Sequence, residues 1–354
     1  MDKRFMVRGV DAGTPLGEAA PALLRAKAKP LFELEDDARG GADMDAVHDM
    51  RVASRRLREA MRLFAPLYPQ REFKAWYRSI RTITRALGPV RDSDVFIDSF
   101  SRLSRELGDG GRRCVAFVVG YRSARRELEL EALNTALNTL DLSESKRSFK
   151  RLVNTPLESS HAKRPLAKFA YSEVAARAAT VFGAQPEALA ETNTLKQHAL
   201  RIHYKRLRYA AETFAPSYGD AFDSLHETLT SFQDALGDLH DLHVFLEALR
   251  APGLADAAAR AGVSPDDIAE VDALLEWRGH ETYLRFVRLV RDYPPDRLLP
   301  ELLLPLVGAN AAGPTPWVLT AAGHERAEET EPREIPKIAL VVEFVEDTSE
   351  RGAV

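Results

Sequence analysis

Cysteine is nearly absent from this sequence: Cys114 is the only one in 354 residues, so no disulfide can form within the chain. Such a composition suits a reducing compartment. The sequence also lacks the apolar core of a secretory signal and any apolar run of the roughly 20 residues that span a membrane. We therefore expect a cytoplasmic protein that is not secreted and does not enter a membrane.

Motifs that usually mark catalysis are missing as well. The chain has no Walker A loop, no GxGxxG, no GxSxG and no cysteine cluster. His240 and His243 put two imidazoles one helical turn apart beside Asp241, but isolated pairs of this kind are common on helices. We therefore predict no catalytic residue, no metal and no cofactor, and a protein that is not an enzyme.

Charge is abundant but unevenly distributed. The chain carries 49 Lys and Arg against 53 Asp and Glu, a net charge of −4. Between Asp45 and Arg91, however, eleven bases face four acids, whereas residues 324–354 hold four bases and nine acids. Because the local field steers a ligand more than the total charge does, the first of these segments favours an anionic partner.

Apolar residues recur with helical spacing almost throughout, and glycine and proline mark the breaks. Gly88-Pro89 separates two of the expected helices, Asp92 and Asp241 are predicted N-caps, and a capping box is predicted from Thr194 to Gln197. The expected helices lie near 16–35, 46–66, 70–87, 92–108, 111–141, 164–183, 195–215, 220–237, 240–250 and 264–292.

An internal repeat is the most informative pattern. The segment His48–Arg58 matches His198–Arg208 at an offset of 150 residues, and Ala86–Phe96 matches Ala235–Phe245 at an offset of 149. Two motifs in the same order at nearly the same offset predict two related helical bundles, over residues 16–155 and 164–307.

The segment after the second bundle differs from the rest. Residues 308–354 are rich in Pro and Gly and then acidic, and Ile338–Val345 is the one convincing strand pattern. We expect a C-terminal tail that docks on this chain or on a neighbouring copy, which would make a dimer.

Residues 47–64 form an amphipathic helix when placed at about 100° per residue. One face is apolar, and the other carries a basic ridge roughly 21 Å long. Neighbouring like charges repel by a few tenths of a kcal/mol per pair, so a bound anion would stabilise the ridge. We call this set the first stripe: His48, Arg51, Arg55, Arg58 and Arg62.

The repeat supplies a second stripe, and the helix after the first stripe adds further bases at spacings of 4, 3 and 4 residues. Acidic or neutral residues replace these bases in the second half: Asp223, Glu227, Thr230 and Asp234. We therefore predict an uneven anion site in which the first half dominates. The second stripe is His198, Arg201, Lys205 and Arg208, and the added bases are Lys74, Arg78, Arg81 and Arg85.

Each feature also has a plainer explanation. A charged helical face is often only solvated, and a histidine near a helix start often has a structural hydrogen bond. Arg56 and Arg206 lie off the stripes and are expected to pair with buried acids such as Asp92 or Asp241, while His203 is expected in the core or an interface. Five arginines either line the same groove or face away: Arg122, Arg125, Arg126, Arg285 and Arg288.

The motifs HxxRVxxRRLR, from His48, and ALGxxRDxxVF, from Ala86, with related copies in the second half, resemble those of the CHAD domain, the conserved histidine α-helical domain. The resemblance covers about residues 16–305. It implies an all-α fold of two pseudo-symmetric four-helix bundles. It also implies a basic groove that binds inorganic polyphosphate, and association with polyphosphate granules in bacteria.

Some CHAD relatives carry an N-terminal CYTH triphosphate tunnel domain. Few residues precede the first bundle here, and Glu33-Leu34-Glu35 lacks the lysine of the ExExK pattern, so we expect no CYTH domain. The functional hypothesis is non-catalytic polyphosphate binding by the two stripes and the added bases. One alternative is binding of nucleic acid or another polyanion, although the stripe has no Phe, Tyr or Trp on which bases could stack. The other alternative is a metal-dependent phosphohydrolase.

Overall fold

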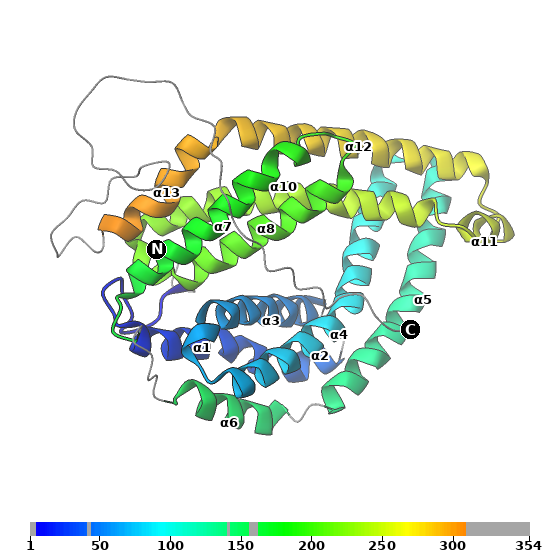
Figure 1. Ribbon diagram of the computed structural model, residues 1–354. Helices are drawn as coiled ribbons and strands as arrows, with labels where there is room; N and C mark the ends of the chain where they lie inside the picture. The colour runs from blue at the N-terminus through cyan, green and yellow to red at the C-terminus, as the bar shows by residue number, and fades with distance from the viewer. Residues whose placement is uncertain (1–4, 41–43, 140–141, 156–161, 309–354) are drawn as a thin grey trace, which may run out of the picture. The chain divides into compact units, whose positions relative to one another are not determined.

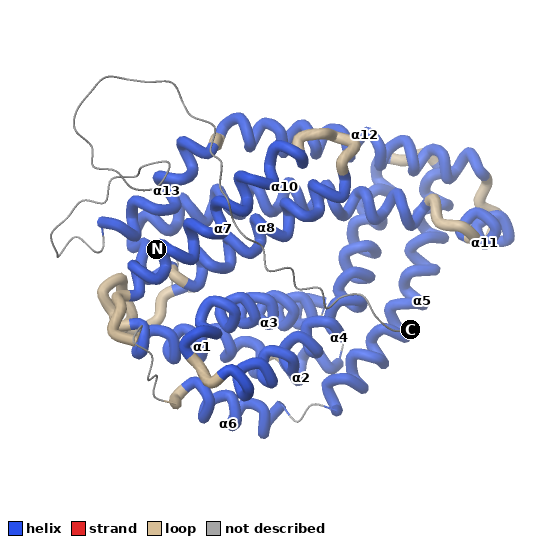
Figure 2. Tube along the Cα trace, viewed as in Figure 1, coloured by secondary structure: helices blue, strands red, loops and turns tan. Residues whose placement is uncertain are grey.

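The computed structural model describes residues 5–40, 44–139, 142–155 and 162–308. Within these ranges the chain consists of helices and loops without a strand (Figure 2), so the predicted all-α class is confirmed. Figure 1 shows the helices, which are α1 (Leu16–Glu33), α2 (Glu35–Gly40), α3 (Met44–Phe64), α4 (Gln70–Leu103), α5 (Asp109–Thr139), α6 (Leu142–Val153), α7 (Leu166–Ala188), α8 (Thr194–Thr213), α9 (Ala215–Tyr218), α10 (Phe222–Leu249), α11 (Leu254–Arg260), α12 (Pro265–Asp292) and α13 (Pro295–Gly308).

Two expected helix breaks are wrong. Helix α4 runs without interruption through Gly88 and Pro89, and α10 runs through Gly237. Asp92 and Asp241 therefore lie inside helices and are not N-caps. Proline removes one backbone hydrogen bond and normally breaks a helix, but α4 has buried apolar side chains on both sides of Pro89 that hold its path.

The helix starts are set by local capping. Helix α8 begins at Thr194, one residue before the expected start. Its N-cap is Asn193, whose side chain accepts from the Lys196 backbone N–H, so the capping box predicted from Thr194 to Gln197 is wrong. A complete capping box opens α12, where Ser264 and Asp267 exchange hydrogen bonds with each other's backbone N–H.

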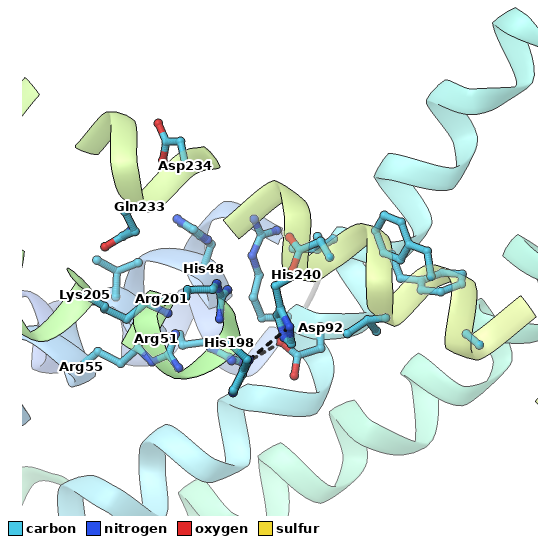
Figure 3. Close-up of a pocket in the computed structure, with 18 of the residues that line it drawn as sticks. His48, Arg51, Arg55, Asp92, His198, Arg201, Lys205, Gln233, Asp234 and His240 are labelled. Atoms are coloured by element: carbon cyan, nitrogen blue, oxygen red, sulfur yellow. Dashed lines mark hydrogen bonds and ion pairs between the residues drawn. The ribbon is translucent and has the colours of Figure 1, made fainter. Parts of the chain in front are cut away.

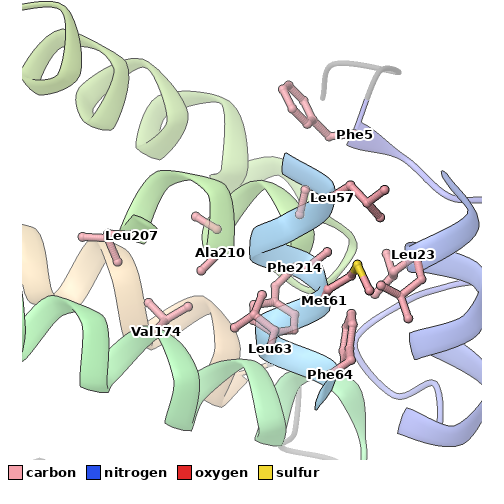
Figure 4. Packing of buried hydrophobic residues seen from close by; sticks show 14 of the residues in the cluster. Phe5, Leu23, Leu57, Met61, Leu63, Phe64, Val174, Leu207, Ala210 and Phe214 are labelled. Carbon is pink, nitrogen blue, oxygen red and sulfur yellow. The ribbon is translucent and has the colours of Figure 1, made fainter. Parts of the chain in front are cut away.

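The described residues form two hydrophobic cores, and each contains residues from both halves of the sequence. In the larger core, Leu57 and Phe64 of α3 pack near Leu23 of α1 and near Phe214, which directly follows α8 (Figure 4). The smaller core joins α4, α5, α10 and α12. Helices α4 and α10 contribute to both cores, so they link the two regions as continuous rods. The smaller core is built around Phe96, Phe100, Val118, Phe245 and Val271.

The two copies of the predicted repeat lie on helices that pack against each other. Helix α3 contacts α1, α4 and α8, and α8 correspondingly contacts α7, α10 and α3. The starts of α1 and α7 pair in antiparallel fashion: the Leu16 N–H donates to Arg164 O at 2.8 Å, and the Leu166 N–H donates to Thr14 O at 2.9 Å. Internal duplication and the bundle boundaries at 16–155 and 164–307 stay predictions.

The C-terminal tail and membrane-spanning helices were also the subject of predictions. The acidic tail with its strand at Ile338–Val345, and the dimer it would form, lie outside the described residues. No helix in the described ranges combines the length and apolarity needed to cross a bilayer.

Candidate anion-binding site

Helices α3, α4, α5, α8 and α10 surround a cavity of about 890 Å³, which we call the central cavity. Figure 3 shows side chains of both stripes directed into the same space. Eight Lys or Arg side chains face four aspartates, an excess of positive charge that attracts anions. The basic lining is Arg51, Arg55, Arg56, Arg91, Arg122, Arg201, Lys205 and Arg208 with His48, His198 and His240, and the acids are Asp49, Asp92, Asp234 and Asp241.

Arg51 is fixed against α4 rather than exposed as the sequence suggested. Its side chain is 16% exposed, and its Nη1 donates to the Gly88 carbonyl at 2.6 Å and lies 3.2 Å from the Asp92 carboxylate. A Cβ at position 88 would come within 3.2 Å of that nitrogen, so glycine permits the approach. The hydrogen bond to the Gly88 carbonyl and the nearby Asp92 carboxylate together hold the Arg51 guanidinium at the cavity wall.

Arg201 occupies the matching place on α8, beside Gly237 and Asp241. A Cβ at position 237 would be 3.9 Å from Arg201 Nε, which is ordinary contact. Burial lowers the pKa of Arg201, opposed by the Asp241 carboxylate, and its buried Nε has no hydrogen-bond partner within the described ranges. A buried donor left unpaired costs about 1–3 kcal/mol, so this place suits an acceptor that the described residues do not supply.

Arg55 and Lys205 are the least committed cations of the cavity. Among the described residues, neither side chain has a hydrogen bond or ion pair. Burial, followed by the charges of Arg55 and Arg201, lowers the pKa of Lys205 to about 6. A lysine that resists protonation beside several arginines indicates a positive field that lacks a counter-charge.

The histidines lie at the same cavity but in different settings. His198 and His240 face each other with their Nδ1 atoms 3.2 Å apart, so one proton can be shared between them. Burial and then Arg201 lower the pKa of His240 to about 4. Burial and then Arg91 lower the pKa of His48. All three imidazoles are therefore neutral at pH 7, and the structural explanation has direct support for His198 through its partner.

The far end of the first stripe lies outside the cavity lining, and the far end of the second stripe is already paired. Arg58 Nη2 donates to the Tyr77 hydroxyl at 3.2 Å, and Arg62 donates to Glu59 at 3.2 Å and lies over the same tyrosine ring. Arg208 is 7% exposed and lines the cavity, but its guanidinium is already used: it donates to Gln233 at 2.7 Å and to Glu212 at 2.6 Å.

The added bases of α4 lie outside the cavity lining. The row leads away from Gly88, so that Arg85 is about 4.5 Å and Lys74 about 21 Å from it along the helix axis at ~1.5 Å per residue. Lys74, Arg78 and Arg85 are exposed and Arg81 is half-buried. This row can extend the site along α4 but does not build its walls.

Arg56 pairs with a buried acid as expected, but that acid is Glu212 and not Asp92 or Asp241. Arg56 Nε donates to the buried Glu212 carboxylate at 2.7 Å, and His226 and Arg208 bind the same group. Burial opposes ionisation of Glu212, but the hydrogen bond from His226 and the two arginines outweigh it and lower the pKa to about 2. Arg56 is thus a structural cation at the cavity edge.

Of the five arginines whose direction the sequence left open, one lines the central cavity and the other four do not. Arg122 lines the cavity, whereas Arg125 pairs with Glu129, Arg126 with Asp94, and Arg285 with Asp238. Arg288 is exposed on α12 and is not in the cavity lining.

Sequence reasoning missed Arg91 and Tyr121. Arg91 belongs to the second motif, two residues after Pro89. Its position in that motif could have identified it as a candidate for the site. Tyr121 carried no signal, because its place depends on how α5 packs. His240 was considered only as half of a metal pair; within the described residues no group of three or more His, Cys, Asp or Glu is arranged to hold a metal ion.

The fold and the cavity define an all-α protein with a basic site between two helices that carry related motifs. The CHAD domain family model matches residues 22–250, more than half of the chain, and the chain belongs to this family. No curated protein matches the chain.

Solved structures support the same fold. The crystal structure of the CHAD domain from the plant Ricinus communis has a TM-score of 0.55 and 22% sequence identity, covering 88% of this chain and 97% of that one. PptA from Streptomyces chartreusis has a TM-score of 0.57 and 18% identity, covering 78% of this chain and 100% of its own. At these identities the likeness concerns the fold alone.

Proposed function

We propose that this protein binds inorganic polyphosphate in the central cavity without catalysing its breakdown. The observation that carries the proposal is the convergence of Arg55, Arg201 and Lys205 on one space, where no described residue accepts a hydrogen bond from their side chains. The CHAD family is associated with polyphosphate, which makes this polyanion the first ligand to test. A role in bringing the protein to polyphosphate granules follows from the same binding.

Arginine suits this ligand because its planar fork donates two parallel hydrogen bonds to phosphate oxygens and stays charged. Arg51, held by Gly88 and Asp92, supplies a fixed donor at the cavity wall. Lys205 adds a charge that a bound anion would restore. The α4 row beyond Gly88 would contact the parts of a long chain that leave the cavity.

Titration with polyphosphates of graded length tests the proposal. Affinity should rise with chain length, because one ligand engages several cations, and it should fall steeply with salt as counterions are released. Weak binding that is equal at every chain length would contradict it. No orthophosphate should be released with Mg²⁺ or Mn²⁺; release that disappears in His48→Ala would indicate a phosphohydrolase instead.

Nucleic acid is the second candidate, and one observation favours it. Tyr121 of α5 lines the cavity and is 58% exposed, so it could stack on a base. The stripes themselves carry no aromatic residue. Competition at physiological salt separates the two ligands: single-stranded DNA or RNA that readily displaces long-chain polyphosphate would assign the cavity to nucleic acid.

A further inference from the structure

A second, smaller cavity of about 280 Å³ lies among α3, α7 and α8, and we call it the side cavity. Its lining shares no residue with the central cavity. Its volume is at the small end for ligand sites, which suits one compact group rather than a chain. It is lined by Glu59, Arg62, Arg177, Thr180, His203 and Arg206.

Glu59 organises the arginines of this cavity. Its side chain is 3% exposed, and Oε1 accepts from Arg177 Nη2 at 2.8 Å and Nε at 3.1 Å, while Oε2 accepts from Arg62 Nη1 at 3.2 Å. Arg177 also donates Nη1 to the Glu173 carboxylate at 2.8 Å and to the Glu173 carbonyl at 3.0 Å, so each of its three guanidinium nitrogens has an acceptor. Arg62 keeps its remaining donors, and its side chain is 39% exposed.

Arg206 has no such partner. It is exposed, and among the described residues no hydrogen bond or ion pair involves its guanidinium. Burial, followed by the Arg62 charge, lowers the pKa of Arg206, while Glu59 raises it. His203 contributes one more hydrogen-bonding group, and burial and then Arg206 lower its pKa, so it is neutral at pH 7.

The matching place in the other half of the chain shows how a carboxylate can neutralise the corresponding arginine. At an offset of 150 residues, Arg206 corresponds to Arg56 and Arg62 corresponds to Glu212. There the glutamate gives Arg56 a carboxylate partner at 2.7 Å. In the side cavity a second arginine, Arg62, stands where the other half has this glutamate. The carboxylate present there, Glu59, is bonded to Arg62 and Arg177, so within the described part of the chain Arg206 is left without an ion pair of its own.

We propose that the side cavity is a separate binding site for a single phosphoryl group, held between Arg206 and Arg62 with His203 as a hydrogen-bonding neighbour. Two oxygens of the tetrahedral phosphoryl group can accept hydrogen bonds from the two guanidinium groups, while a third oxygen faces the imidazole. Glu59 positions Arg62 from behind and does not contact the ligand. The group is either a free small phosphate or one end of a polyphosphate chain.

Calorimetric titration with inorganic pyrophosphate at fixed ionic strength tests this site. The parent variant is Arg55→Glu with Lys205→Glu, which disables the central cavity. Pyrophosphate should still bind it, and adding Arg206→Gln should weaken that binding at least tenfold. The matched control is Arg105→Gln, an exposed arginine without a hydrogen bond or ion pair in the described structure, which should change binding less than twofold.

Two results would overturn the site: pyrophosphate fails to bind the parent variant, or Arg206→Gln leaves that binding within twofold while circular dichroism shows an intact fold. Failure of the proposed function is a different result, namely long-chain polyphosphate binding the parent variant as tightly as the wild type.

The source of the phosphoryl group follows from a second titration. Pyrophosphate that still binds wild-type protein saturated with long-chain polyphosphate identifies a free small phosphate. Loss of that binding, together with weaker long-chain binding by Arg206→Gln alone, identifies the end of the same chain.

Discussion

Helix α3 carries Arg58 and Arg62 where helix α8, 150 residues later, carries Arg208 and Glu212. The α3 pair stays partly exposed beside Tyr77, whereas the α8 pair is buried and bonded to itself at 2.6 Å. Arginine at this place is partly exposed in α3, whereas glutamate at the matching place in α8 forms a structural ion pair. The two stripes have the same spacing and different uses.

The largest expected effect breaks the α8 ion pair. Glu212→Gln should lower the free energy of unfolding by about 3–5 kcal/mol, because it leaves buried Arg208 and half-buried Arg56 without their shared carboxylate. Arg62→Gln, at the matching place on α3, should cost under about 1 kcal/mol, because its ion pair is partly solvated. Urea unfolding measures both. Equal losses would show that the two places are not used differently.

Protonation of Lys205 gives the next effect. Its pKa of about 6 in the free protein should rise when a polyanion binds, so binding takes up a proton and polyphosphate affinity should fall roughly tenfold from pH 6.5 to 8. Calorimetry at pH 8 in buffers of different ionisation enthalpy measures the uptake. Lys205→Arg should keep the affinity and abolish most of the uptake; unchanged uptake in that variant would assign the proton elsewhere.

The two glycines that face the stripes provide a smaller contrast. Gly88→Ala should weaken polyphosphate binding about fivefold, because the new Cβ would press on Arg51 at 3.2 Å, a loss of about 1 kcal/mol. Gly237→Ala is the matched control, since its Cβ would meet Arg201 at 3.9 Å, and affinity should stay within about twofold. Both substitutions raise helix propensity and should not unfold their helices. The Tm checks this, because a loss of binding that comes from unfolding would be accompanied by a lower Tm.

Much of this arrangement could be predicted from the sequence. Helical periodicity gave the class and most boundaries, and the repeat placed matching motifs on two helices that do pack together. The breaks at Gly88-Pro89 and Gly237 were wrong because local propensity yields to packing when a helix joins two cores. The i,i+4 spacing of Arg208 and Glu212 is visible in the sequence. Burial of Arg208 was out of reach, because it depends on Gln233 of α10 meeting it in three dimensions.

The α4 row shows the same limit from another side. A helical wheel gives the relative directions of Lys74 and Arg78, but it does not say which neighbouring helix they face. In the structure these two side chains are exposed and lie away from Gly88 along α4. The spacing that correctly indicated a basic face therefore overstated the number of residues that build the central cavity.

The most direct test of the central cavity compares two double charge reversals in titrations with long-chain polyphosphate. Arg55→Glu with Lys205→Glu should lower affinity at least about 100-fold, because charge-assisted hydrogen bonds are lost and replaced by repulsion. Lys74→Glu with Arg78→Glu, the same pair of residue exchanges on α4, should lower it no more than about threefold. A larger loss from the α4 pair than from the cavity pair would contradict this account.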